Sequence, residues 1–277
     1  MSNETEFSKQ GGKRIGAVVL VLLIVVAAAV LLFYFMLSSL KAKSEGSEGT
    51  AAGNHPTAYA YEKATATNGM ELHVLATKPS NVTLETIQNN VALTPDYGIN
   101  GGFFYEKALL SIAVVNSLPV NGAIDEYGSG SKNVKYKRGT LVWDGANNTL
   151  SVQVVGDASE LKVMDHTRFW AQGGISMSLG KDEAWEQQIL AEQAPYPDEA
   201  RLRSAAIYDR NGILYLVVSS TKGTLAEFRD AIVEEVGDGL LEDGIFLDGD
   251  GSSQLRSAEA QLTGDNRPVV QMMKIVK

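Results

Sequence analysis

The sequence predicts an α+β domain, built on a single mixed sheet and preceded by an N-terminal transmembrane helix. Many short segments alternate apolar and polar residues and are joined by Asn-Gly or Asp-Gly turns, as β-hairpins are. Residues 224–236 instead repeat apolar side chains with the period of a helix. Strands with few helices indicate the α+β class, and one long apolar run near the N-terminus indicates a membrane segment.

The apolar run covers residues 16–37 without a charged side chain. At about 1.5 Å per residue it crosses a hydrocarbon core of roughly 30 Å. A cleaved signal peptide is the alternative, but its apolar core is usually about 7–15 residues long, and no convincing small-residue cleavage site follows this run. Three basic residues before the run outnumber the two shortly after it, which favours an N-terminus inside the cell.

Four regions follow from this reading. We predict a cytoplasmic tail at 1–14, a transmembrane anchor at 15–38, a flexible linker at 39–56 and one domain at 57–277. The linker is rich in Ser, Gly, Glu and Ala and has no apolar periodicity. We therefore expect a single-pass protein of the cell membrane whose C-terminal domain is extracytoplasmic.

Composition excludes several functions. A formal net charge of -9 argues against nucleic-acid binding through a general basic field. The chain has no cysteine, so disulfides, thiolate zinc sites and a cysteine nucleophile are excluded.

The first half of the domain reads mainly as strands. Segments 58–61 and 70–76 form a hairpin around Asn68-Gly69, and His73 within it is interpreted as a solvent-facing or packed residue rather than a ligand. Residues 82–91 are predicted to form a short helix, because three apolar residues share one face. Further strands are predicted at 111–115, 139–143 and 149–155, with an exposed polar loop at 125–137, whereas residues 97–105 are unusual for an ordinary strand.

The second half predicts a hairpin at 201–219, turning at Asn211-Gly212. Thr224 and Glu227 have the spacing of a capping box at the start of the helix. Other predicted features are a strand at 169–180, a lid or surface excursion at 181–200, a short buried strand at 245–247 and a closing strand at 269–276.

Asp248 is the strongest candidate for a functional side chain. It ends the apolar strand 245–247, and a glycine-rich turn with two hydroxyls follows. Such a turn can direct backbone N–H groups at a ligand and hold a carboxylate at the rim of a rigid sheet. The alternative is an ordinary tight turn. The residues after Asp248 are Gly249, Asp250, Gly251, Ser252 and Ser253.

Two further glycine pairs stand beside polar or aromatic residues. Asn100 precedes Gly101-Gly102 and then Phe104, and a second pair is Gly173-Gly174. Glycines inside strands indicate close backbone approach or a bulge, and an asparagine side chain can both donate and accept. A hairpin with a turn-forming asparagine is the alternative for the first pair.

These pieces, in this order, resemble the motifs of the phosphodiester glycosidase family. The family pattern has Asn-Gly-Gly-(Phe/Tyr)-Phe, as at residues 100–104, then Arg-(Thr/Ser)-Ala, as at Arg203, and Leu-Asp-Gly-Gly-Gly-Ser, as at 247–253. The resemblance covers roughly residues 59–277 and includes the helix before the last motif. It departs from the family at Asp250, where the pattern has glycine.

The resemblance implies an extracytoplasmic hydrolase that cleaves the glycosidic bond of a sugar-1-phosphodiester. We expect its substrate to be a carbohydrate or sugar-phosphate polymer of the cell envelope. Asp248, Arg203 and Asn100 are then the catalytic candidates. Arg203 suits the departing phosphate, Asn100 a sugar hydroxyl or N-acetyl group, and Asp248 the anomeric carbon as nucleophile, base for water or electrostatic partner. The implied substrate-binding residues are Gly101, Gly102, Phe104, Gly173, Gly174, Gly249, Asp250, Gly251, Ser252 and Ser253.

Asp250 keeps two other interpretations open. Its charge beside Asp248 could weaken binding of an anionic substrate, which would leave a non-catalytic glycan- or wall-polymer-binding module on the same fold. Two close carboxylates could also recruit a divalent cation, and Asp248, Asp250, Ser252 and Glu259 have the spacing of a calcium loop, although position 6 lacks its glycine. We expect no other metal or cofactor. For Arg203, a surface salt bridge is the alternative to a substrate contact.

Overall fold

The computed structural model describes residues 55–277. The predicted cytoplasmic tail, the anchor at 15–38 and nearly all of the predicted linker lie outside the described residues. Within residues 55–277, no helix is both long and apolar enough to span a membrane.

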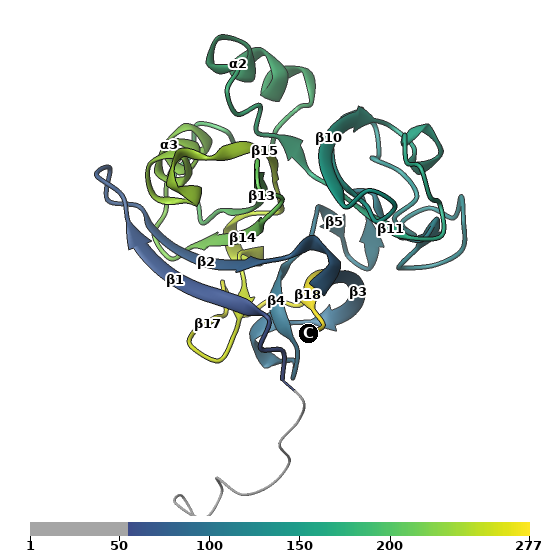
Figure 1. Ribbon diagram of the computed structural model, residues 1–277, viewed down its shortest axis with the longest axis horizontal. Helices are drawn as coiled ribbons and strands as arrows, with labels where there is room; N and C mark the ends of the chain where they lie inside the picture. Colours follow the sequence, from purple (N-terminus) through teal and green to yellow (C-terminus); the bar gives the residue numbers. More distant parts are fainter. Residues whose placement is uncertain (1–54) are drawn as a thin grey trace, which may run out of the picture. The chain divides into compact units, whose positions relative to one another are not determined.

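The domain is dominated by antiparallel strands, with two α-helices (Figure 1). The largest sheet has the strand order β1-β2-β14-β13-β15-β12. It contains the two predicted hairpins and the strand that leads to Asp248. Its strands are β1 (Tyr59–Thr65), β2 (Glu71–Thr77), β12 (Ile175–Ser176), β13 (Ser204–Asp209), β14 (Leu214–Ser219) and β15 (Leu241–Phe246).

Two five-stranded sheets and a two-stranded ribbon complete the domain. One sheet has the order β10-β9-β11-β7-β8, formed by β7 (Ala113–Val115), β8 (Leu118–Pro119), β9 (Arg138–Asp144), β10 (Thr149–Val155) and β11 (Phe169–Gly173). The other has the order β17-β16-β4-β18-β3, formed by β3 (Val82–Asn89), β4 (Tyr97–Asn100), β16 (Leu255–Arg256), β17 (Gln261–Leu262) and β18 (Val269–Ile275). The ribbon joins β5 (Phe104–Tyr105) to β6 (Ala108–Leu109).

The prediction of one mixed sheet is therefore wrong, although the sheet-dominated class is confirmed. Turn residues determine which strands are joined as hairpins. They do not determine which hairpins share a sheet, because that depends on pairings between distant segments.

The two helices have different roles. α3 (Leu225–Glu235) packs against the six-stranded sheet, where Phe228 contacts Phe246 with ring centroids 6.3 Å apart. α2 (Asp182–Ala191) lies in the segment predicted as a lid or surface excursion and is mostly exposed (Figure 1). The larger core cluster joins side chains from all three sheets, including Trp143, Trp170 and Met273.

The helix predicted at 82–91 is wrong, because residues 82–89 form β3. Val82 and Leu84 are buried and lie on one face of the strand, and β3 pairs with β18 through Leu84 opposite Met273. Long-range pairing with an apolar strand overrides the weak helical period. The loop at 125–137 is also less exposed than predicted, because Gly128 to Ser131 are buried.

The predicted capping box of α3 is confirmed. The Thr224 hydroxyl accepts from the Glu227 backbone N–H at 3.1 Å, and the Glu227 carboxylate accepts from the Thr224 N–H at 2.8 Å. We expect Thr224→Ala to lower the free energy of unfolding by about 1 kcal/mol, because the first turn loses an acceptor. Urea unfolding measures this, with Thr224→Ser as the control that retains the hydroxyl. Equal stability of the alanine variant and the native chain would contradict it.

Candidate active site

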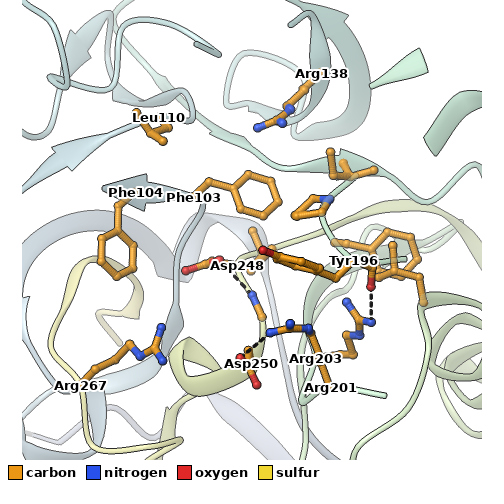
Figure 2. A pocket seen from close by; sticks show the side chains of 16 residues that line it. Phe103, Phe104, Leu110, Arg138, Tyr196, Arg201, Arg203, Asp248, Asp250 and Arg267 are labelled. Carbon is orange, nitrogen blue, oxygen red and sulfur yellow. Dashed lines mark hydrogen bonds and ion pairs between the residues drawn. The ribbon is translucent and has the colours of Figure 1, made fainter. Parts of the chain in front are cut away.

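A pocket of ≈ 330 Å³ opens where β15 ends (Figure 2). This volume is at the lower end of the range for small-molecule sites, about 300–1,000 Å³. Its wall is formed by residues of β12 and β15 in the six-stranded sheet, β9, the ribbon strand β5, α3 and the loops before β13 and β18. The lining residues are Phe103, Phe104, Leu110, Arg138, Ile175, Pro195, Tyr196, Arg201, Arg203, Leu225, Phe246, Leu247, Asp248, Gly249, Asp250 and Arg267.

Asp248 is partly buried in this pocket and is held by its backbone. Its N–H donates to the Gly101 carbonyl at 3.2 Å, and its own carbonyl accepts from Asn100 Nδ2 at 2.8 Å. Burial raises the pKa of the carboxyl to about 6, although the Ser252 hydroxyl, the Gly249 N–H and the charge of Arg267 oppose the rise. Asp248 therefore exchanges a proton close to neutral pH, as a general acid or base does.

Asn100 lies behind Asp248 and outside the lining of the pocket. Its side chain is 1 % exposed and fully engaged, because Oδ1 accepts from Ser204 Oγ at 2.8 Å and from the Gln254 N–H at 3.1 Å. The structure thus places Asn100 as a clamp that joins β4, β13 and the turn after Asp248. It positions Asp248 and does not itself reach the pocket.

Arg203 lines the pocket and is only 5 % exposed. Its Nε donates to the Gly223 carbonyl at 3.0 Å, and its Nη2 donates to the carbonyls of Tyr196 and Glu199 at 2.9 and 2.6 Å. Burial, assisted by the neighbouring charge of Arg201, lowers its pKa to about 10. Among residues 55–277 no carboxylate lies within ion-pair distance of this guanidinium, so the alternative of a surface salt bridge is wrong.

Arg201 and Asp250 form an ion pair at the edge of the pocket, with Nη1 to Oδ2 at 2.6 Å. Arg201 also pairs with Glu199, and its guanidinium lies 4.0 Å from the centre of the Tyr196 ring. Asp250 has φ of 55°, a left-handed conformation that glycine adopts at less cost. The backbone therefore suits the glycine of the family pattern, and the aspartate supplies an internal partner for Arg201.

Two more arginines complete the wall, Arg138 and Arg267. Figure 2 shows Arg201, Arg203 and Arg267 around the turn that follows Asp248, whereas Arg138 lies across the pocket beyond Phe103. Arg267 pairs with Asp265. Arg201 and Arg267 are paired with carboxylates, whereas Arg138 and Arg203 have no ion pair within residues 55–277, so these two can hold an anion. The sequence motifs did not identify Arg138, Arg201, Arg267 or Tyr196 as site residues.

The predicted glycines lie mostly beneath the pocket. A Cβ at Gly174 would stand 2.1 Å from the Phe246 carbonyl oxygen, and one at Gly173 would stand 2.4 Å from Asn133 Oδ1. Gly174 therefore allows the chain before β12 to pass close to β15, and Gly173 allows β11 to pass close to Asn133. Of the predicted substrate-binding residues, Phe104, Gly249 and Asp250 line the pocket, whereas Gly101, Gly102, Gly173, Gly174, Gly251, Ser252 and Ser253 do not.

The backbone of the turn after Asp248 is largely engaged within the protein. The N–H of Asp250 donates to the Leu202 carbonyl at 2.7 Å, and those of Ser252 and Ser253 donate to Gly249 and Asp250 carbonyls. These three N–H groups are therefore not directed at a ligand. The expectation that the glycine-rich turn presents its backbone N–H groups to a ligand is wrong for them. Arginine side chains provide the positive wall instead.

The calcium-loop spacing does not form paired helices, because β15 and β16 flank the turn. Glu259 accepts a hydrogen bond from the Tyr59 hydroxyl at 2.9 Å, and Asp250 is paired with Arg201. Within residues 55–277, no three His, Asp or Glu side chains come close enough together to hold a metal ion.

No family model and no curated protein sequence matches the chain. Among solved structures, the chain is similar to the catalytic domain of zebrafish N-acetylglucosamine-1-phosphodiester alpha-N-acetylglucosaminidase, auto-inhibited by its pro-peptide. The TM-score is 0.53 at 14% identity, over 83% of this chain and 86% of that one. A hypothetical protein from Synechocystis has a TM-score of 0.42 at 12% identity, over 78% of this chain and 61% of that one. The first similarity shows a distant relationship of fold.

We expect Asp250→Gly to raise the affinity of the pocket for inorganic phosphate by about three- to tenfold, because the carboxylate no longer competes for Arg201. Isothermal titration calorimetry measures the affinity. Asp250→Asn tests the charge alone and should behave similarly, whereas Asp250→Glu keeps the charge and should remain weak. Unchanged affinity in both neutral variants would contradict this prediction.

Proposed function

We propose that this protein is a hydrolase that cleaves the glycosidic bond of a sugar-1-phosphodiester. One observation carries the proposal: a carboxyl with a pKa of about 6 shares a pocket with a buried arginine that has no carboxylate partner within residues 55–277. The first group can act at a sugar carbon, and the second can hold a phosphate. The distant fold relationship to a phosphodiester glycosidase domain supports the same reaction.

Cleavage of the sugar C–O bond releases a phosphate monoester, whose second pKa is about 6. Such a leaving group departs as an anion and needs little protonation. Its developing charge must be stabilised, and Arg203 suits this task, because Nε and Nη2 are anchored to carbonyls whereas Nη1 has no hydrogen bond within the described residues. An anchored guanidinium loses little further freedom when it binds the departing phosphate.

Asp248 acts at the anomeric carbon in this proposal. Above pH 6 its carboxylate can attack that carbon, take a proton from attacking water or stabilise the positive charge of an oxocarbenium-like transition state. Asp250 is not a second catalytic carboxylate here, because its charge is committed to Arg201. Nuclear magnetic resonance of the first-formed anomer separates the roles: retention indicates a nucleophile and inversion indicates a base.

We place the enzyme on the outer face of a membrane, anchored by residues 15–38, with the domain beyond a linker. The apolar run of the sequence supports this placement. The substrate class that fits such a position is a carbohydrate or sugar-phosphate polymer of the cell envelope.

A non-catalytic glycan- or wall-polymer-binding module is the second candidate function. The ion pair between Arg201 and Asp250 favours it, because this pair removes one of the cations that a phosphodiester would otherwise use. Such a module would bind glycans saturably and release no product.

The test is hydrolysis by the full-length chain of a panel of sugar-1-phosphodiesters, with N-acetylglucosamine, glucose and mannose in both anomers. Release of a phosphate monoester together with a reducing sugar is the expected result. Sugar-6-phosphodiesters of the same sugars are the control, because they carry no phosphate at the anomeric carbon. Saturable glycan binding without turnover of any member of the panel would contradict the hydrolase proposal and favour the binding module.

A further inference from the structure

The candidate active site continues into an open groove lined by Tyr105, Tyr127 and Tyr136, which we call the tyrosine groove. These side chains are 65, 70 and 40% exposed and line one cavity of ≈ 400 Å³. That cavity shares Leu110 and Arg138 with the pocket of Asp248. Large aromatic side chains that gather on the surface beside a pocket are typical of ligand contacts.

Arg138 forms the wall between the pocket and the tyrosine groove. Its guanidinium carbon lies 5.0 Å from the centre of the Phe103 ring and 5.5 Å from that of Tyr136. Its Nε and Nη2 donate to the carbonyls of Glu192 and Gln193 at 3.0 and 3.2 Å. The group is thereby fixed, and Figure 2 shows it on the side of the pocket away from Asp250.

The three tyrosines lie on backbone that is held by strand pairing and hydrogen bonds. Tyr105 follows Phe104 in β5, and successive side chains of a strand point to opposite faces, so one lines the pocket and the other the groove. The loop that carries Tyr127 and Tyr136 is bonded to the neighbouring segment. The Leu109 N–H donates to the Gly128 carbonyl, and the Val134 N–H donates to the Leu110 carbonyl, both at 2.9 Å.

The groove carries little net charge. A second cavity of ≈ 520 Å³ extends the groove past Tyr105 and Tyr127 and adds the amides of Gln88 and Asn121. The charged residues of the two cavities, apart from the shared Arg138, are Glu106, Glu126, Lys107 and Lys135. With Arg138 the groove has three basic and two acidic residues, and flat aromatic faces with amides and this little net charge suit an uncharged, hydroxyl-rich ligand better than a phosphate chain.

We propose that the tyrosine groove binds the sugar units of a neutral glycan that continues from the sugar held in the pocket. This inference rests on the proposed function, which puts a sugar beside Asp248 and the phosphate among the arginines on the other side. The tyrosine rings stack on the apolar faces of successive sugar rings, and the amides bind hydroxyls. The preferred substrate is then an oligosaccharide or polysaccharide end rather than a single sugar.

Binding of unmodified hexasaccharides of N-acetylglucosamine, glucose and mannose to the full-length chain tests the groove without any reaction. At least one should bind, and Tyr105→Ala with Tyr127→Ala together should weaken it about tenfold or more. The paired phenylalanine variant should restore binding, and Leu93→Ala, an exposed residue outside both cavities, should not change it. The proposal would be overturned if no hexasaccharide binds, or if the double alanine variant binds as tightly as the native chain.

Hydrolysis separates this inference from the proposed function. The ratio of kcat/KM for an oligosaccharyl phosphodiester to that for the single-sugar analogue should exceed one and should fall towards one in the double alanine variant. A ratio of one in the native chain, with good turnover of the single-sugar substrate, would overturn the proposed role of the tyrosine groove and leave the proposed hydrolase activity standing. Hexasaccharide binding that depends on the tyrosines, without hydrolysis, would support the role of the groove and overturn the proposed hydrolase activity.

Discussion

Asp248→Asn is expected to abolish hydrolysis of a sugar-1-phosphodiester while making the folded domain more stable at neutral pH. The amide cannot attack the anomeric carbon or take a proton from water, so kcat should fall by about 10³-fold or more. The backbone hydrogen bonds to Asn100 and Gly101 persist in the variant, and the asparagine Oδ1 can still accept from the Gly249 N–H. The loss is therefore chemical rather than structural.

The gain in stability follows from the raised pKa of Asp248. The folded state holds the proton up to about pH 6, whereas the unfolded chain releases it near the ordinary value of 3.8. Folding is therefore most favourable, as far as this group is concerned, below pH 3.8 and becomes less favourable as pH rises to 6. Asparagine stays neutral at both pH values. The free energy of unfolding of the variant should therefore exceed that of the native chain by about 1–3 kcal/mol at pH 7 and by little at pH 4.

Urea unfolding at pH 4 and pH 7, beside assays of hydrolysis, measures both effects. Asp230→Asn removes an exposed aspartate on α3 and is the control for the change of charge. The native kcat/KM should rise with pH up to about 6 and then level, because the free enzyme needs the carboxylate. Hydrolysis by the asparagine variant would contradict this account. So would a gain in the free energy of unfolding, relative to the native chain, that is smaller at pH 7 than at pH 4.

Arg203→Lys is expected to lower kcat/KM for a phosphodiester by about 10²- to 10³-fold, even though it keeps the positive charge. A single ammonium group cannot bond the carbonyls of Gly223, Tyr196 and Glu199 and also present a fixed donor to phosphate. Both functions of the residue are therefore weakened. The loop that carries Tyr196 also loses its anchor, and the free energy of unfolding should fall by about 1–3 kcal/mol.

Phosphate titration, phosphodiester hydrolysis and urea unfolding measure the effects of the Arg203 variant. Arg210→Lys is the matched control, because Arg210 is exposed at the turn between β13 and β14. The loss should be larger for a phosphodiester substrate than for a neutral hexasaccharide, whose groove lies on the Arg138 side. An equal loss for the two ligands would show that Arg203 acts only through the fold.

The sequence predicts local structure well where the signal is local. Asn68-Gly69 and Asn211-Gly212 identify two hairpins, and the spacing of Thr224 and Glu227 identifies the start of α3. Asp248 could be found because a carboxylate at the end of a buried strand, followed by a glycine turn, is a local pattern. The structure places Asp248, Arg203 and Phe104 in one pocket, although they are far apart in the chain.

The rest of the site depends on which distant segments meet. Arg138 begins β9 and Arg267 precedes β18, and neither stands in a glycine-rich motif, so their shared wall was not predictable from spacing. Asn100 carried a motif signal, but its burial behind Asp248 follows from the pairing of β4 with β18 and β16. The helix expected at 82–91 failed for the same reason, because the partner strand lies about 190 residues later, at Met273 opposite Leu84.

β18 lies between β3 and β4, so a late segment of the chain fills the middle of a sheet begun by early ones. Met272 stands opposite Asn100 in that sheet, and Asn100 in turn holds Asp248. During synthesis β18 therefore cannot pair with β3 and β4 until the residues around 272 have left the ribosome. Until then the edges of β3 and β4 remain unpaired, which exposes the nascent chain to aggregation and makes assembly of the pocket a late, cooperative event.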